Sequence, residues 1–258
     1  MQHKDKIVIV TGAARGLGLA CAERFLADGA KVVMVDILEN AVRSQAERLG
    51  DNATWLTADL SEITQEMAKG IVDKATDHFG GVDVLINNAG IIHFDDFVDF
   101  PEAAFDRVQR VNLKAPFLIG QAAARAMIVQ GRGGSIVNMS SINAILAVPN
   151  SVAYAVSKGG ITQLTAVMAV DLIRHNIRVN AIGPGTILTD MVKSSVLANE
   201  HQRHMILSRT PSGRCGDPAE IASVASFLAS KDASYIVGQT IFADGGRLIL
   251  NYTVPVQE

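Results

Sequence analysis

Apolar runs alternate with longer amphipathic stretches along almost the whole chain. The runs KIVIVTG (6–12) and KVVMVD (31–36) are apolar at nearly every position, which is typical of strands covered on both faces, as in a parallel sheet. The stretches between such runs repeat their apolar residues at helical spacing. Strand, helix and strand in this repeated order predict a doubly wound α/β fold with helices on both faces of the sheet.

The alternation continues without a linker, a low-complexity tract or a sequence repeat, so we expect a single domain of 258 residues. About seven parallel strands are predicted, joined by right-handed crossovers. The predicted strands cover residues 6–12, 31–36, 53–59, 82–90, 134–141, 177–185 and 238–246. Helical patterns include residues 17–28, 62–79, 102–130 and 154–175.

The longest departure from this alternation is TILTDMVKSSVLANEHQRHMILSRTPSGRCG, residues 186–216. It follows a strand end and precedes a helical pattern that begins near Pro218. A long connection at the carboxyl edge of a sheet is a common place for a substrate lid. We expect a lid here, and a surface loop without that role is the alternative.

Composition narrows the function classes. Hydrophobic residues make up 48% of the chain and charged residues 19%, which suits a large core and argues against disorder. The net charge is -3, so no basic excess favours a nucleic-acid or membrane partner. Cys21 and Cys215 fit neither a disulfide framework nor a metal site, and we expect no metal. Without a signal segment or an apolar run of ~18 residues, the expected location is cytoplasmic.

The segment TGAARGLG follows the first predicted strand and opens the first helix. Gly12, Gly16 and Gly18 leave no side chain where a backbone must turn tightly or approach a ligand. The free N–H groups and the dipole at a helix N-terminus favour a pyrophosphate there. In this strand–turn–helix–strand context the glycines predict a Rossmann-type dinucleotide site.

An acid follows the glycine turn at the spacing expected for a ribose contact. Asp36 ends the second predicted strand, where a carboxylate can bind both ribose hydroxyls of NAD and would repel the 2′-phosphate of NADP. Arg15 complicates this choice, because a guanidinium in the turn can meet a phosphate. We rank Asp36 above Arg15 and expect NAD as the cofactor, with a turn or cap aspartate as the alternative.

A tyrosine and a lysine stand four positions apart in SVAYAVSKGG, residues 151–160. Positions four apart share one face of a helix, so Tyr154 and Lys158 can point into one cleft. A nearby ammonium favours phenolate and should lower the pKa of the tyrosine. An ordinary surface pair is the alternative while this motif stands alone.

Taken together, the motifs resemble the short-chain dehydrogenase/reductase family. TGAARGLG, NNAG (87–90), the SS that ends the fifth strand, YAVSK and the PG after the sixth strand occur in order, from about residue 6 to about residue 246. The resemblance implies an NAD-dependent oxidoreductase acting on CH–OH donors. Residues 6–150 would mainly bind the dinucleotide, and 151–250 would carry the catalytic helix and the lid.

The resemblance also implies a catalytic set of Asn112, Ser141, Tyr154 and Lys158. The family's spacing of thirteen residues before the tyrosine selects Ser141 over Ser140. Tyr154 would take the hydroxyl proton, Ser141 would orient the substrate oxygen, and Lys158 would hold the cofactor ribose. Asn112 would fix a water that links Lys158 to solvent. Further cofactor contacts implied by the resemblance are Leu17, Asp59, Leu60, Asn88, Ala89, Gly90, Tyr154, Lys158, Pro184, Gly185, Ile187 and Thr189.

The substrate and the assembly are less closely defined. Pocket walls are expected at His93, Asn143, Asn150 and Thr186, whose polar side chains suit a sugar, a polyol or a hydroxy acid, although each could be a turn residue. A homotetramer, or a homodimer, is expected, with residues 102–130 and 154–175 at one interface.

Three functions compete at this point. The first is an NAD-dependent dehydrogenase of a polar secondary alcohol or sugar. The second is a 3-oxoacyl carrier-protein reductase, which would prefer NADPH and need a basic docking surface. The third is a non-catalytic nucleotide-sensing protein on the same fold, which would predict damage to the catalytic set. Asp36 and the mild net acidity argue against the second, and the intact set argues against the third.

Overall fold

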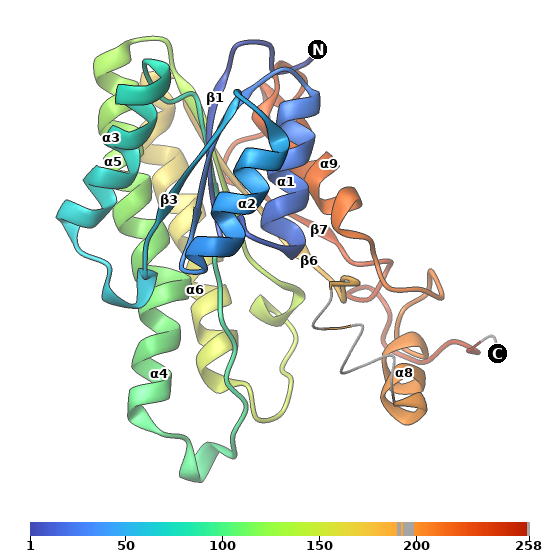
Figure 1. Ribbon diagram of the computed structural model, residues 1–258. Coiled ribbons are helices and arrows are strands. Elements are labelled where there is room, and N and C mark those ends of the chain that lie inside the picture. Colours follow the sequence, from blue (N-terminus) through green and yellow to red (C-terminus); the bar gives the residue numbers. More distant parts are fainter. Residues whose placement is uncertain (190–191, 193–198, 257–258) are drawn as a thin grey trace.

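A computed structural model describes residues 1–189, 192 and 199–256. Its centre is a seven-stranded sheet with the order β3-β2-β1-β4-β5-β6-β7, in which every neighbouring pair is parallel (Figure 1). The predicted doubly wound α/β fold is therefore confirmed. The strands are β1 (Ile7–Thr11), β2 (Lys31–Asp36), β3 (Ala53–Thr57), β4 (Val84–Asn87), β5 (Gly134–Met139), β6 (Ile177–Pro184) and β7 (Thr240–Ala243).

Helices cover both faces of the sheet, because alternate strand residues feed two separate cores. Ile7 and Ile9 pack with α3, α5 and α6, whereas Val8 and Val10 pack with α1, α2 and α9. Figure 1 shows α3 and α5 on one side of the sheet and α1 and α9 on the other. The helices are α1 (Gly16–Ala27), α2 (Glu39–Leu49), α3 (Gln65–Phe79), α4 (Glu102–Gln109), α5 (Ala115–Gln130), α6 (Val152–Leu172), α8 (Glu200–Leu207) and α9 (Pro218–Ala229).

The helical pattern predicted over 102–130 is confirmed, with α4, a π-helical segment at Arg110–Lys114 and α5 following one another without a break. Helix α2 lies between β2 and β3, where the repeated order of strand, helix and strand predicts a helix, and it buries Val42 and Ala46.

The order of the strands in the sheet indicates where a ligand would bind. The chain passes from β3 at one edge to β4 on the far side of β1, so the direction of winding reverses between β1 and β4. In open α/β sheets ligands bind outside the carboxyl ends of the strands at this switch point. The glycine turn after β1 and the NNAG segment after β4 lie on its two sides.

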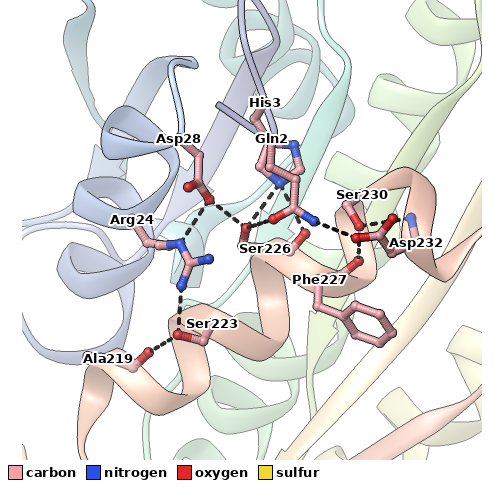
Figure 2. A network of polar contacts seen from close by, with 10 residues as sticks. All are labelled: Gln2, His3, Arg24, Asp28, Ala219, Ser223, Ser226, Phe227, Ser230 and Asp232. Carbon is pink, nitrogen blue, oxygen red and sulfur yellow. Dashed lines mark hydrogen bonds and ion pairs between the residues drawn. The ribbon is translucent and has the colours of Figure 1, made fainter.

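A polar network fastens the end of α1 to α9 (Figure 2). Nε2 of the buried His3 lies 3.0 Å from the carbonyl oxygen of Ser226, which can only accept, so Nε2 carries the proton. The Ser226 hydroxyl donates to Asp28 at 2.7 Å, and Arg24 donates to the same carboxylate at 2.8 Å. Burial lowers the pKa of His3, so the ring is neutral near pH 7. The network therefore holds the helix that begins at the glycine turn against the helix that follows the expected lid.

The remaining sequence expectations concern cysteines, metals and membranes. Cys21 is fully buried, and burial raises the pKa of its thiol to about 12, so it is a packing residue. Within the described residues Cys21 and Cys215 form no disulfide, and no three His, Cys, Asp or Glu side chains gather as metal ligands. In the same part of the chain, no helix combines the length and the apolarity that crossing a bilayer requires.

Candidate active site

The predicted catalytic residues meet beyond the carboxyl ends of β4 and β5. Ser141 follows β5 and caps the short 3-10 helix Ile142–Ala144, where its Oγ accepts from the Asn143 N–H at 3.1 Å. Tyr154 and Lys158 lie in the first turns of α6, and the Lys158 Nζ is 5.5 Å from the centre of the Tyr154 ring. The loop after β5 and the start of α6 thus bring Ser141, Tyr154 and Lys158 together in one polar cluster.

Ser140 and Ser141 have different surroundings. The Ser140 hydroxyl donates to the Lys158 carbonyl at 3.1 Å and lies 3.0 Å from Thr162 Oγ1, so it ties β5 to the backbone of α6. Ser141 instead lies close enough to the Tyr154 hydroxyl to lower the pKa of that group. The geometry therefore supports Ser141 as the serine beside the reacting group.

The electrostatics of the pair differ from the sequence expectation. Burial raises the pKa of Tyr154, and the neighbouring Ser141 side chain only partly offsets this rise. Burial also lowers the pKa of Lys158 to about 8. The predicted lowering of the tyrosine pKa is thus wrong for the cofactor-free site, because removing the phenolate from water outweighs its stabilising neighbours.

Lys158 and Asn112 are both held by backbone groups. The Lys158 ammonium donates to the Met139 carbonyl at 2.7 Å. Asn112 lies in the π-helical segment, and its side chain accepts from the Ile91 N–H at 2.8 Å and donates to the Ile91 carbonyl at 2.9 Å. A Cβ placed on Gly90 would lie 3.5 Å from Asn112 Oδ1 and 3.6 Å from Lys158 Nζ, so the two side chains flank one point. π-Helical turns of this kind often occur at functional sites.

The glycine turn can hold a dinucleotide phosphate. Gly12 and Gly16 have positive φ angles of 66° and 58°, and a Cβ on Gly18 would overlap the Gly12 carbonyl oxygen. The Asn88 amide donates to the Thr11 and Gly12 carbonyls at 2.9 and 3.1 Å, which fixes the turn against β4. Among the described residues no side chain caps the N-terminus of α1. Its first N–H groups are therefore available to an anion, and the site fits the expected cofactor.

Asp36 is fixed beside this turn. One carboxylate oxygen accepts from the Ala14 N–H at 2.9 Å and the other accepts from the Leu38 N–H at 3.0 Å. Arg15 is exposed on the same turn. Asp36 therefore does stabilise a backbone turn, as the alternative interpretation expected. The same two hydrogen bonds orient its carboxylate next to the glycine turn.

The other predicted cofactor residues surround the same edge of the sheet. The Asp59 carboxylate accepts from the Ser61 N–H and hydroxyl at 2.9 and 2.7 Å, which shapes the loop after β3. The methyl group of Thr189 lies 3.5 Å from a Cβ placed on Gly16, so the segment after β6 reaches over the glycine turn. Leu60 and Ile187 are buried, Pro184 ends β6 and Gly185 follows it, while Leu17, Ala89 and Gly90 lie at the turn and at the end of β4.

Thr11 belongs to this site but is absent from the prediction. Its hydroxyl accepts from the Asn88 and Ala89 N–H groups at 3.1 Å each, and so holds NNAG against the glycine turn. A polar residue at the carboxyl end of an otherwise apolar strand was the signal available in the sequence.

The predicted substrate residues lie on adjoining loops. His93 Nε2 is 3.8 Å from Asp95 Oδ2, and Asp95 donates its backbone N–H to the Asn150 carbonyl at 2.9 Å. Asn150 is exposed with a positive φ of 62°, which identifies it as a turn residue. Asn143 is half-buried beside Ser141, and the Thr186 backbone carbonyl accepts from the Gly216 N–H at 3.0 Å. Residues 190–191 and 193–198 of the expected lid lie outside the described residues, whereas α8 belongs to the described part.

Comparison with known proteins agrees with this geometry. The family model described as Enoyl-(Acyl carrier protein) reductase matches residues 12–247. A 3-oxoacyl-[acyl-carrier-protein] reductase of Vibrio cholerae is 36% identical, covering 97% of this chain and all of that protein. A 2-dehydro-3-deoxy-D-gluconate 5-dehydrogenase of Escherichia coli is 37% identical, covering 95% of this chain and 96% of its own. An L-rhamnose 1-dehydrogenase (NAD(P)(+)) of Sphingomonas is 38% identical, covering 95% and 97%.

A solved structure from Agrobacterium tumefaciens, named as a candidate 2-deoxy-D-gluconate 3-dehydrogenase with bound NADP, has a TM-score of 0.86. It shares 35% sequence identity, and the match covers 96% of this chain and 98% of that one. Fold, site geometry and relatives of nearly full length agree. The chain belongs to the short-chain dehydrogenase/reductase family of NAD(P)-dependent oxidoreductases.

Proposed function

We propose that this oxidoreductase transfers a hydride between NAD and a polar secondary alcohol, with a sugar, a polyol or a hydroxy acid as the substrate class. The observation that carries the reaction is the meeting of Ser141, Tyr154 and Lys158 at one point beyond β5. The observation that favours NAD is the Asp36 carboxylate, which two backbone N–H groups fix beside the glycine turn.

Each residue has a separate task in the proposed reaction. When bound, the nicotinamide cofactor supplies the hydride acceptor. Ser141 donates a hydrogen bond to the substrate oxygen, and Tyr154 takes the proton of the hydroxyl group. Lys158 binds the cofactor ribose, and its charge, 5.5 Å from the centre of the Tyr154 ring, favours the phenolate form. Asn112, held at both ends of its amide by Ile91, positions a water near Lys158.

The cofactor would be held by the glycine turn and by the strand ends around it. We assign the pyrophosphate to the α1 N-terminus, the adenosine ribose to Asp36 and the nicotinamide side to the segment after β6. The proposed contacts are Gly12, Arg15, Gly16, Leu17, Gly18, Asp36, Asp59, Leu60, Asn88, Ala89, Gly90, Tyr154, Lys158, Pro184, Gly185, Ile187 and Thr189.

The proposal is tested by measuring NADH release in a panel of polyols, aldoses, hydroxy acids and simple secondary alcohols. Polar substrates should be oxidised faster than simple alcohols, with NAD preferred over NADP. Activity confined to 3-hydroxyacyl thioesters with NADP would instead support the carrier-protein reductase. Cofactor binding without turnover of any alcohol or ketone would support the nucleotide-sensing alternative.

We also propose a homotetramer, or a homodimer, with α4, α5 and α6 at one interface. Phe117 and Val129 on α5 and Val170 on α6 are apolar yet exposed, with Val129 89% and Val170 75% accessible. A groove of about 620 Å³ lies between these helices and includes Phe117 and Leu164 in its walls. A second copy would bury this surface.

Sedimentation velocity tests the assembly. The wild-type protein should sediment as an oligomer, and Val170→Asp should shift it towards a smaller species, because the new carboxylate would be buried without a partner. Thr57→Asp, on the exposed edge strand β3, is the matched control and should leave the mass unchanged. A wild-type monomer at micromolar concentration would rule out the proposed interface.

A further inference from the structure

The π-helical segment Arg110–Lys114 lies directly against α6, the helix that carries the proposed catalytic tyrosine and lysine. A Cβ placed on Gly160 of α6 would lie 3.0 Å from the Leu113 side chain, so this glycine allows the segment to approach closely. At the same contact the Asn112 amide nitrogen donates to the Ser157 hydroxyl at 3.1 Å. Both side chains are buried, so this hydrogen bond is shielded from water.

The directions of the hydrogen bonds at Ser157 are fixed by its partners. Its Oγ lies 2.7 Å from the Tyr154 carbonyl oxygen, which can only accept, so the hydroxyl donates its hydrogen there. The same Oγ can then only accept from Asn112. Ser157 therefore requires Asn112 to turn its amide nitrogen, and not its oxygen, towards α6.

The backbone of Ile91 requires the same orientation of the Asn112 amide. The Ile91 N–H can only donate and lies 2.8 Å from Oδ1, while the Ile91 carbonyl can only accept and lies 2.9 Å from Nδ2. In this orientation Oδ1 lies 3.5 Å from a Cβ placed on Gly90, and the Lys158 Nζ lies 3.6 Å from the same point. Asn112 therefore presents an acceptor oxygen on the side of the Lys158 ammonium, where the reversed amide would present N–H donors to a positive charge.

The Lys158 ammonium has donors available for further partners. It is buried, and within the described part of the chain its one hydrogen bond is the 2.7 Å contact with the Met139 carbonyl. An ammonium has three N–H donors, so two remain for the groups that the proposed function assigns to this place, the cofactor ribose and a water. An amide oxygen has two lone pairs, and the Ile91 N–H uses one of those on Asn112, so the second can accept from that water.

We infer that Ser157 is a positioning residue for the proposed reaction. Ile91 fixes the Asn112 amide relative to the loop after β4, and the Ser157 hydroxyl fixes it relative to α6 and to the backbone of Tyr154. Ser157 acts on the reaction through Asn112. This inference rests on the proposed function and adds to it a residue that lies outside the predicted catalytic set.

A double-mutant cycle tests this coupling. Ser157→Ala removes a buried acceptor from Asn112, so the amide holds its productive orientation less firmly and kcat should fall about 3- to 10-fold, the effect of one lost hydrogen bond. KM and the affinity for NAD should stay close to wild type, because Ser157 is assigned no contact with either ligand. In an Asn112→Ala background Ser157→Ala should cause no further loss of kcat, since the partner through which it acts is gone.

Thr165→Ala is the matched control for the loss of a buried hydroxyl. Thr165 is fully buried about two turns further along α6, where its Oγ1 accepts from the Asn138 amide nitrogen at 2.9 Å. Both variants lose a hydrogen bond between an asparagine amide and a hydroxyl of the same helix, so both should lower the melting temperature. Thr165→Ala should nevertheless keep the kcat of the wild type.

Three results would overturn the inference and assign Ser157 to packing alone. These are a wild-type kcat in Ser157→Ala, equal losses of kcat in Ser157→Ala and Thr165→Ala, and additive losses in the cycle with Asn112→Ala. Each of these results leaves the proposed dehydrogenase intact. Failure of every substrate in the wider panel would instead reject the proposed function, and the inference with it.

Discussion

Replacing Tyr154 with phenylalanine is expected to lower the rate of alcohol oxidation by about 10²- to 10⁴-fold, the usual contribution of a positioned acid–base group. The substitution removes the only atom of Tyr154 that can take the substrate proton and keeps the ring that packs beside Lys158. The affinity for NAD, measured by fluorescence titration, should therefore change little. The loss should appear in kcat rather than in binding.

The pH profile gives a second readout of the same residue. Burial raises the pKa of Tyr154 in the empty site, so the wild-type rate of oxidation should rise with pH as the phenolate forms. Tyr235→Phe is the matched control, because Tyr235 is fully exposed and the same hydroxyl is removed. Turnover by Tyr154→Phe within about tenfold of wild type would contradict the proposed proton transfer.

Replacing Asp36 with asparagine is expected to change the ratio of kcat/KM for NAD and NADP about 100-fold towards NADP. The carboxylate would lie next to the 2′-phosphate of NADP, and placing like charges together costs several kcal/mol. Asparagine keeps the shape of the side chain but can accept from only one of the Ala14 and Leu38 N–H groups, which bind different oxygens of the carboxylate. The repulsion of the 2′-phosphate is therefore lost together with one of the two bonds that fix the turn. Initial rates with the two cofactors measure the ratio.

Two controls define this prediction. Glu39→Gln, in the first turn of α2, removes a nearby negative charge that does not touch the glycine turn and should leave the ratio unchanged. Arg15→Gln should reduce whatever NADP activity is present, because the exposed guanidinium belongs to the glycine turn beside which the phosphate is expected. A wild-type preference for NADP, or an unchanged ratio in Asp36→Asn, would reject Asp36 as the determinant.

The sequence predicted the strands well because a strand buried on both faces is apolar at nearly every position, and few other structures have that pattern. Ile7 and Ile9 feed one core and Val8 and Val10 the other, so an unbroken apolar run had a single consistent interpretation. Helical spacing did not reveal the π-helical turn at Arg110–Lys114, although Pro116, which has no N–H for the carbonyl four residues before it, follows that turn directly.

The site was predicted as residue types, but its electrostatics were not. Spacing placed Tyr154 and Lys158 on one helix face, as found, yet spacing carries no information about solvent. In the folded chain burial raises the pKa of Tyr154 and lowers that of Lys158 to about 8. Desolvation depends on every atom around a group, so it follows only from the packed structure.

By itself, the sequence determined the alternation of buried strands and helices, the glycine turn and the spacing of the tyrosine and lysine, because these depend on neighbours along the chain. Only the tertiary structure decided which groups meet across it. It brought Asp36 against the backbone of Ala14, placed the Ser140 hydroxyl against the α6 backbone, and laid the turn after β7 against the segment that follows α8. Such contacts arise where strand ends converge at one edge of the sheet, and the linear order of residues does not contain that convergence.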